Sequence, residues 1–299
     1  MRFCSISDLH LMARKPSCRK DDFIETQFRK LEFIFQTAKE NGEILFIAGD
    51  VFDSPKEPYL LTYRLIKLIK KYKIKVYVIA GQHDMHFHNP DFVNTPLGIL
   101  ISTGLVTFFG YIKIDGISFC GNTWGKNYYK KADVLITHEM VIQEDSILEG
   151  KTECKRAFHL LREHDYKLIL SGDNHQEFIE KNNGKILINA GSVTRTKKDQ
   201  KQHNPHVYVI DIDKSGVKGI NAFHIPIEKD VFKEEEKVKE VSSDIMNGIK
   251  DLIGKMRENE KKKIIPFFDI VSYSIKEMIK NKEPEAESIK NKIQEYFQD

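Results

Sequence analysis

Short apolar runs that end in glycine or polar residues recur along the first 190 residues of the chain. The clearest is 44–48, ILFIA, which leads directly into Gly49-Asp50. A short apolar run bounded by a turn signal is typical of a buried parallel strand. Similar runs predict strands at 2–7, 75–80, 134–137 and 167–171, and apolar residues at helical spacing predict helices at 23–40 and 58–72. This alternation indicates an α/β (α+β) fold.

Shorter strands separated by turns follow from residue 104 onward. Asp115-Gly116 lies between two apolar runs and predicts a hairpin. Asn183-Gly184 predicts a second hairpin, and further strands are expected at 206–211 and 217–225, with a helix near 154–164. The short strands between residues 104 and 121, of which the first is 105–109, predict a second, partly antiparallel sheet.

The composition is that of an ordinary soluble protein, with 40% hydrophobic and 30% charged residues. The net charge of +3 is too small to indicate a nucleic-acid partner by itself. The four cysteines are scattered and no apolar run reaches membrane-spanning length, so we expect a cytoplasmic protein without a membrane partner. A shift to charge-rich composition predicts a main domain at 1–227 and a small helix-rich C-terminal extension at 228–299.

Five of the expected strands end in side chains that can bind metal ions. Ligands in α/β folds lie at the carboxyl ends of strands, and residues i and i+2 of an extended chain point to the same side. The junctions supply Asp8, His10, Asp50, Gln82, His83, His138, Asp173 and His175. Oxygens and imidazoles without a thiolate suit Mn²⁺, Fe or Zn²⁺. Because eight residues exceed what one ion needs, we expect two ions that share Asp50.

The motifs DLH, GDVFD, GQHD, THE and GDNH, in this order, resemble those of the calcineurin-like metallophosphoesterases over about residues 1–225. The resemblance implies a four-layer sandwich of two mixed β-sheets flanked by helices. Within that superfamily SDLHL, AGDVFD followed by SPKEPYLLTYR, and NAGSVTR most resemble the SbcD-type nuclease subunit of DNA double-strand-break repair complexes.

The resemblance also implies ligands and catalytic roles, position by position. It gives one metal Asp8, His10, Asp50 and His175, and it gives the other Asp50, Gln82, His138 and Asp173. His83 would face the scissile phosphate as a general acid, Asp84 would hydrogen-bond His83 and orient it, and Asp53 would support the ligands from behind. The implied cofactor is two divalent ions, Mn²⁺ before Mg²⁺, Fe or Zn²⁺.

Two ligand positions depart from the family pattern. Gln82 stands where the family usually has Asn, and Asp173 stands where it usually has His. Both side chains can still bind a metal ion. A carboxylate at 173 adds negative charge to the second position, which favours Mn²⁺ or Mg²⁺.

Three functions are compatible with this pattern. The first is a Mn²⁺-dependent DNA exo- or endonuclease in repair, recombination or replication, with an SbcC-type coiled-coil ATPase and a second copy of the chain as implied partners. Basic residues on the loops could contact DNA phosphates, although a solvated loop explains any single cluster equally well. The foremost candidates are Arg14, Lys15, Arg195 and Lys197. The others are Arg19, Lys20, Lys126, Lys130, Lys131, Lys198 and Lys201. The second is a small-molecule (nucleotide) phosphodiesterase or phosphatase. The third is a non-catalytic scaffold with a decayed second metal site.

Overall fold

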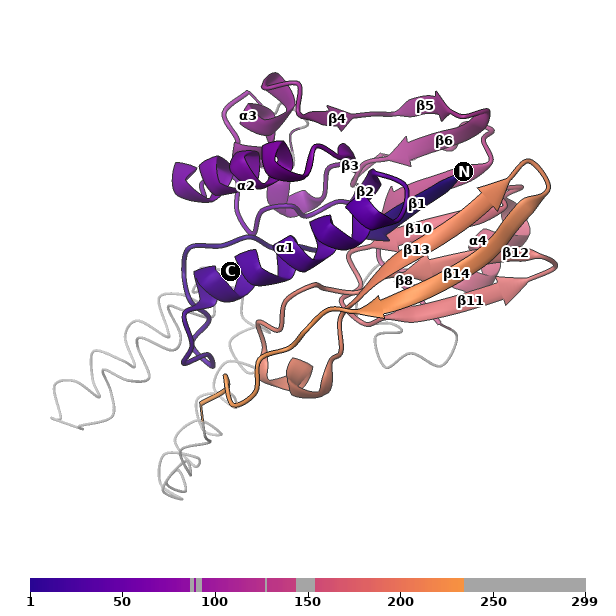
Figure 1. Ribbon diagram of the computed structural model, residues 1–299. Helices are drawn as coiled ribbons and strands as arrows, with labels where there is room; N and C mark the ends of the chain where they lie inside the picture. The colour runs from indigo at the N-terminus through magenta and orange to yellow at the C-terminus, as the bar shows by residue number, and fades with distance from the viewer. Residues whose placement is uncertain (87–88, 90–92, 127, 144–153, 234–299) are drawn as a thin grey trace, which may run out of the picture. The chain divides into compact units, whose positions relative to one another are not determined.

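The computed structural model describes residues 1–86, 89, 93–126, 128–143 and 154–233 (Figure 1). The expected C-terminal extension lies outside the described residues from position 234 onward, and the boundary near residue 227 stays a prediction. Residues 228–233 pack on the main unit, where Lys20 N–H donates to the Val231 carbonyl and Lys233 N–H donates to that of Cys18.

The first sheet has six strands in the order β14-β13-β1-β2-β3-β4. Its strands are β1 (Arg2–Ile6), β2 (Ile44–Ala48), β3 (Lys75–Ile79), β4 (Val106–Phe108), β13 (His206–Asp213) and β14 (Gly216–His224). The four strands β1 to β4 are parallel, and β13 and β14 add an antiparallel edge.

The second sheet also has six strands, in the order β11-β12-β10-β7-β6-β5. Its strands are β5 (Tyr111–Ile114), β6 (Ile117–Asn122), β7 (Val134–His138), β10 (Leu168–Gly172), β11 (Phe178–Asn182) and β12 (Lys185–Asn189). Its four inner strands are parallel and both edges are antiparallel hairpins. A separate short pair joins β8 (Val141–Ile142) to β9 (Lys155–Arg156).

Helices cover the outer face of each sheet. Three helices pack on the first sheet, α1 (Phe23–Glu40), α2 (Tyr59–Tyr72) and α3 (Pro96–Ser102) (Figure 1), and α4 (Ala157–Glu163) packs on the second. A third apolar cluster fills the space between the two sheets. The main unit is therefore the expected sandwich of four layers, helix, sheet, sheet and helix. No helix in the described part of the chain is long and apolar enough to span a bilayer.

Strand β2 shows why its sequence is apolar at every position. Leu45 and Ile47 point toward the helices, whereas Phe46 and Ala48 point toward the second sheet. Successive side chains of a strand face opposite sides, so a strand between two packed layers needs apolar residues on both. This packing fixes the end of β2, from which Gly49 and Asp50 follow.

Most expected elements are confirmed, and the differences are local. The helix at 23–40 is confirmed residue for residue, because the Asp22 side chain accepts a hydrogen bond from Glu25 N–H and caps it. The strand expected at 105–109 belongs to the first sheet, since β4 pairs in parallel with β3. Helix α3 and the β8–β9 pair were not predicted, because short elements have too few periodic positions to show in the sequence.

The inter-sheet layer predicts one large stability effect. Phe46 is fully buried and its ring lies 5.1 Å from that of Phe3 and 4.7 Å from that of Phe119. We expect Phe46→Ala to lower the free energy of unfolding by about 3–5 kcal/mol, because it leaves a cavity between the sheets. Urea unfolding followed by circular dichroism measures this. The control is Phe223→Ala on β14, where the side chain is 39% exposed, and an equal loss in both variants would contradict the packing argument.

Candidate metal centre

The ends of five strands, three from the first sheet and two from the second, bring the expected ligands together. Asp8 and His10 follow β1, Asp50 follows β2, and Gln82 and His83 lie in a short 3-10 turn after β3. From the second sheet, His138 is the last residue of β7, and Asp173 and His175 follow β10. Three overlapping groups have ligand atoms within 4.8 Å of one another: Asp8, His10 and His175; His10, Asp50 and His83; and Asp8, Asp50 and His138.

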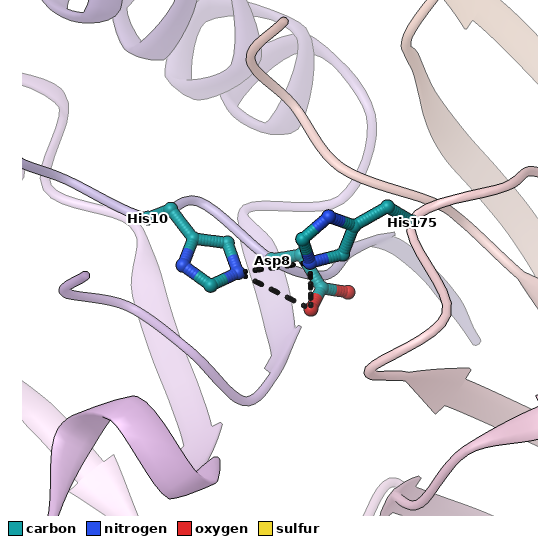
Figure 2. A group of neighbouring side chains, drawn as sticks. All are labelled: Asp8, His10 and His175. Carbon is teal, nitrogen blue, oxygen red and sulfur yellow. Dashed lines mark hydrogen bonds and ion pairs between the residues drawn. The ribbon is translucent and has the colours of Figure 1, made fainter. Parts of the chain in front are cut away.

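The first group places two imidazoles against one carboxylate, and Figure 2 shows both rings facing Asp8. The Nε2 atoms of His10 and His175 lie 3.1 Å apart, at 3.8 Å and 3.7 Å from Asp8 Oδ1. Burial opposes a charge on either ring, but the Asp53, Asp50 and Asp8 carboxylates raise the pKa of His10 to about 9. For His175 burial prevails and lowers the pKa to about 4. The two Nε2 atoms and Asp8 Oδ1 therefore form a group that could hold a metal ion.

Asp53 fixes the orientation of the His10 ring. His10 Nδ1–H donates to Asp53 Oδ1 over 3.0 Å, which turns Nε2 toward Asp8 and His175. A carboxylate behind a ligating histidine is a common means of setting the tautomer of the ring. This contact is the support that the sequence assigned to Asp53.

The group of Asp8, Asp50 and His138 centres on a buried imidazole and a buried carboxylate. His138 Nδ1–H donates to the Ala48 carbonyl over 2.6 Å, so Nε2 faces Asp50 Oδ2 at 3.2 Å. Asp50 Oδ2, His138 Nε2 and Gln82 Oε1 are buried and have no hydrogen-bond partner among the described residues. Buried polar atoms are nearly always paired, and a cation satisfies three such atoms at once. The residues present therefore fit a metal ion at this position.

In the group of Asp8, Asp50 and His138, the pKa values of the carboxyls and of the imidazole depend on one another. Burial disfavours a charged imidazole, but Asp50, followed by Asp8 and Asp173, raises the pKa of His138 to about 10. Burial raises the pKa of Asp173, against the hydrogen bond from Gln82. For Asp50, burial is outweighed by His138 and His10, which hold the pKa of the carboxyl well below its usual range. Metal binding at such a site displaces protons from the histidines.

Four of the ligand residues adopt the left-handed backbone conformation. The φ angles are 51° at Asp8, 43° at His10, 50° at Asp50 and 77° at Asp173. Such residues cost about 1–3 kcal/mol each and persist only where the surroundings fix them. Here the backbone fixes them, since Asp8 N–H donates to the Gly49 carbonyl, His10 N–H to the Asp50 carbonyl, and Asp173 N–H to the Asp8 carboxylate. These hydrogen bonds tie the ligand residues of neighbouring loops to one another.

Three glycines that precede the ligands leave room for the His138 ring. A Cβ at Gly49 would lie 2.3 Å from His138 Nδ1, and one at Gly172 would lie 2.7 Å from the same atom. A Cβ at Gly81 would lie 2.0 Å from Asp50 Oδ1 and 2.6 Å from His138 Nε2. At these three strand-to-loop junctions, glycine is therefore required by the His138 ring and, at Gly81, also by the Asp50 carboxylate.

Asp84 does not orient His83, contrary to the expectation from the resemblance. Its carboxylate is buried and accepts hydrogen bonds from the backbone N–H groups of Val51, Phe52 and Gly81. His83 Nδ1–H instead donates to the Asp53 carbonyl over 2.7 Å. Asp84 thus ties the loop after β2 to the loop after β3, and the backbone of Asp53 sets the His83 ring.

Arg195 is also placed differently from the expectation of a DNA contact. It is only 4% exposed, and its guanidinium donates to the carbonyls of Lys201 and Glu228. Arg19 is fully buried and pairs with Asp21. The remaining foremost basic residues, Arg14, Lys15 and Lys197, are exposed.

The sequence analysis did not predict that the loop at 191–195 supports the ligand residues. Val193 N–H donates to the Asp8 carbonyl and Ser192 N–H donates to that of His175. The buried Lys30 ammonium donates to the Val193 carbonyl over 3.2 Å. The available signal was a lysine within the apolar stripe of helix α1, next to Leu31. This loop therefore holds the backbones of two ligand residues, Asp8 and His175.

Comparison with known proteins identifies one family and several similar proteins. Residues 1–177 match the model of the calcineurin-like phosphoesterase family. An 85-residue stretch is 35% identical to DNA double-strand break repair protein Mre11 of Aeropyrum pernix; it covers 26% of this chain and about a fifth (20%) of the length of that relative. A solved structure of an archaeal phosphodiesterase aligns with 75% of this chain and 100% of its own at 16% identity and a TM-score of 0.38. A putative 5'-nucleotidase from Staphylococcus aureus aligns with 79% of this chain and 56% of its own at 14% identity and a TM-score of 0.47.

The glycine geometry predicts that one methyl group abolishes one of two metal-binding events. Gly81 does not have a left-handed φ, so Gly81→Ala leaves the backbone allowed and adds only a Cβ between Asp50 and His138. We expect the second of two Mn²⁺ binding events to disappear in isothermal titration calorimetry. Gly110→Ala is the control, because no heavy atom lies within 4 Å of its added Cβ. Two unchanged binding events in Gly81→Ala would refute the steric argument.

Proposed function

Because the chain belongs to the calcineurin-like phosphoesterase family, we propose that it is a phosphodiesterase that uses two metal ions and cleaves DNA. The observation that carries this proposal is a set of buried atoms without a hydrogen bond among the described residues, which are the ion-paired Asp50 Oδ2 and His138 Nε2 and the amide oxygen of Gln82. This set lies beside the cluster of Asp8, His10 and His175. Asp50 would serve both ions, because it lies within reach of His10 on one side and His138 on the other.

Two divalent ions at such a site neutralise phosphate oxygens and lower the pKa of a bound water, which makes it a nucleophile at neutral pH. The protein holds the ligands in place beforehand, through backbone hydrogen bonds and through carbonyls that set the tautomers of His138 and His83. Manganese is the ion that we expect first, because oxygen and imidazole ligands without thiolates suit it.

His83 is the residue that we assign to proton transfer. Its Nδ1–H is held by the Asp53 carbonyl, so Nε2 is the atom left to give a proton to the departing sugar oxygen. The ring lies beside His10, with the two ring centres 4.8 Å apart. General acid catalysis of this kind contributes about 10²–10⁴-fold.

DNA is the substrate that the resemblance to the SbcD-type subunit and the short match to Mre11 support. Arg14, Lys15 and Lys197 are exposed, and Lys197 is near enough to His175 to influence its pKa. We extend the proposal to an SbcC-type ATPase and a second copy of the chain as partners, and to a cytoplasmic role in DNA repair, on the resemblance alone.

The first test is Mn²⁺-dependent degradation of end-labelled double-stranded DNA. We expect the parent protein to shorten the DNA and Asp50→Asn to lose at least about 10³-fold of this activity, because the bridging carboxylate is gone. Product lengths distinguish exo- from endonuclease action. If DNA stays intact while a small diester is hydrolysed, the substrate is a small molecule such as a nucleotide. If neither reacts, even with an SbcC-type ATPase added, the non-catalytic scaffold replaces the enzyme.

A second test separates proton donation from metal binding. His83→Asn is expected to keep its Mn²⁺ stoichiometry and to lose about 10²–10⁴-fold in DNA cleavage. With bis(4-nitrophenyl) phosphate the loss should be much smaller, because nitrophenolate departs without a proton. Equal losses on both substrates would show that His83 does not act as the acid.

The exposed basic residues provide a third test. Replacement of Arg14, Lys15 and Lys197 by Ala is expected to weaken DNA binding and to lower the slope of log K against log salt by about 0.9 for each lost phosphate contact. Hydrolysis of the small diester should stay unchanged. Lys70→Ala with Lys75→Ala is the matched control, because Lys75 opens β3 at the end away from the metal centre. An unchanged salt slope in the triple variant would remove these residues from the DNA surface.

A further inference from the structure

The two ligands that depart from the family pattern contact each other directly. Gln82 lies after β3 in the first sheet and Asp173 lies after β10 in the second, 91 positions apart in sequence. The Gln82 Nε2–H group donates to Asp173 Oδ1 over 2.7 Å. The two departures are therefore one structural feature of this chain.

This hydrogen bond fixes which way the Gln82 amide faces. A carboxylate accepts hydrogen bonds and does not donate them, so the amide nitrogen must face Asp173. The amide oxygen is then the buried atom, and it has no hydrogen-bond partner among the described residues. A buried acceptor in this state requires a donor or a cation. The Asp173 carboxylate thus determines that Gln82 offers oxygen to the metal position.

The two metal positions consequently differ in donor chemistry. The first is offered the imidazoles of His10 and His175 together with carboxylates. The second is offered a single imidazole, from His138, together with the carboxylates of Asp8 and Asp50. The buried Gln82 Oε1 adds an amide oxygen, and Asp173 orients that amide through its hydrogen bond. Oxygen ligands favour Mg²⁺ and Mn²⁺ relative to Zn²⁺, whereas imidazole suits Zn²⁺ well.

We propose that Gln82 and Asp173 form one coupled ligand unit, which shifts the second metal position toward Mn²⁺ and Mg²⁺ and which fails when either residue is replaced alone. The lengths of the side chains support the coupling. Asparagine at 82 is one methylene shorter than the glutamine whose Nε2–H reaches Asp173 over 2.7 Å, and histidine at 173 has no carboxylate to accept that hydrogen bond. The inference rests on the proposed metal-dependent function and adds the class of ion that this site selects.

The test is a double-mutant cycle with metal binding as its readout. The proteins are the full-length parent, Gln82→Asn, Asp173→His, and the double variant, each titrated with Mn²⁺ and Zn²⁺ by calorimetry, with bound metal counted by mass spectrometry. We expect each single change to weaken the second Mn²⁺ site at least about tenfold. The double variant should regain two sites and show a ratio of Zn²⁺ to Mn²⁺ affinity at least about tenfold above that of the parent. The product of the fold-losses in Mn²⁺ affinity of the two single variants should therefore exceed the fold-loss of the double variant.

Gln36→Asn with Asp165→His is the matched control, since both residues are exposed, and thermal unfolding verifies that every variant is folded. The proposal would be overturned if the fold-losses in Mn²⁺ affinity of the two single variants multiplied to give that of the double variant. It would also be overturned if the double variant kept the parent's ratio of Zn²⁺ to Mn²⁺ affinity, or if the parent bound only one Mn²⁺ ion. The binding readout does not depend on turnover. A coupled cycle in a protein that cleaves no diester would retain this inference and reject the proposed function, whereas an uncoupled cycle in an active enzyme would do the reverse.

Discussion

The buried carboxylate of Asp50 is the charge on which the rest of the centre depends. It is fully buried and receives a backbone hydrogen bond from His83 N–H at Oδ1, while Oδ2 has no hydrogen-bond partner in the described part of the chain. A buried charge is costly unless opposite charge compensates it. The compensation comes from His138 and His10, which lie 3.2 Å and 3.5 Å from Oδ2 and whose pKa values are raised as a result. His138 and His10 thus offset the buried charge of Asp50, and both rings belong to groups that could hold a metal ion.

The packing of the two sheets makes this arrangement possible. Because both faces of β2 are buried, the strand end cannot shift, and Asp50 is delivered at a fixed point. His138 arrives from β7 in the opposite sheet, and it fits only because Gly49, Gly81 and Gly172 carry no side chain. The strained backbone of the ligand residues is held by hydrogen bonds between loops of different strands. The centre is thus a property of how two sheets meet, and neither sheet could form it alone.

The sequence predicts the scaffold and the ligand set better than it predicts the supporting contacts. Buried runs such as ILFIA and the helical stripe of α1 repeat over enough positions to be recognised, and motif order identifies the ligands even when their types vary. The failures concern side chains whose role depends on what lies across from them. Asp84 stands next to His83 in sequence, yet its carboxylate accepts hydrogen bonds from backbone N–H groups of another loop. Arg195 lies in a basic segment, but its guanidinium donates to backbone carbonyls of the same chain. Tertiary partners of this kind leave no local pattern. Strand β4 was assigned to the wrong sheet for the same reason, because sheet membership is decided by long-range pairing.

The exchange of ligand types at the second position also bears on which phosphate ester the site suits. On the proposed ligand set, the carboxylates of Asp8, Asp50 and Asp173 face two divalent cations, and a carboxylate in place of an imidazole at 173 removes one unit of positive charge from the face that meets the substrate. The attraction between site and substrate scales with the product of their charges. A phosphodiester carries one negative charge at neutral pH and a phosphomonoester carries nearly two, so the lost positive charge weakens monoester binding about twice as much. On the proposed ligand set, the carboxylate at 173 would therefore favour diesters over monoesters, which is the preference that the proposed nuclease function requires.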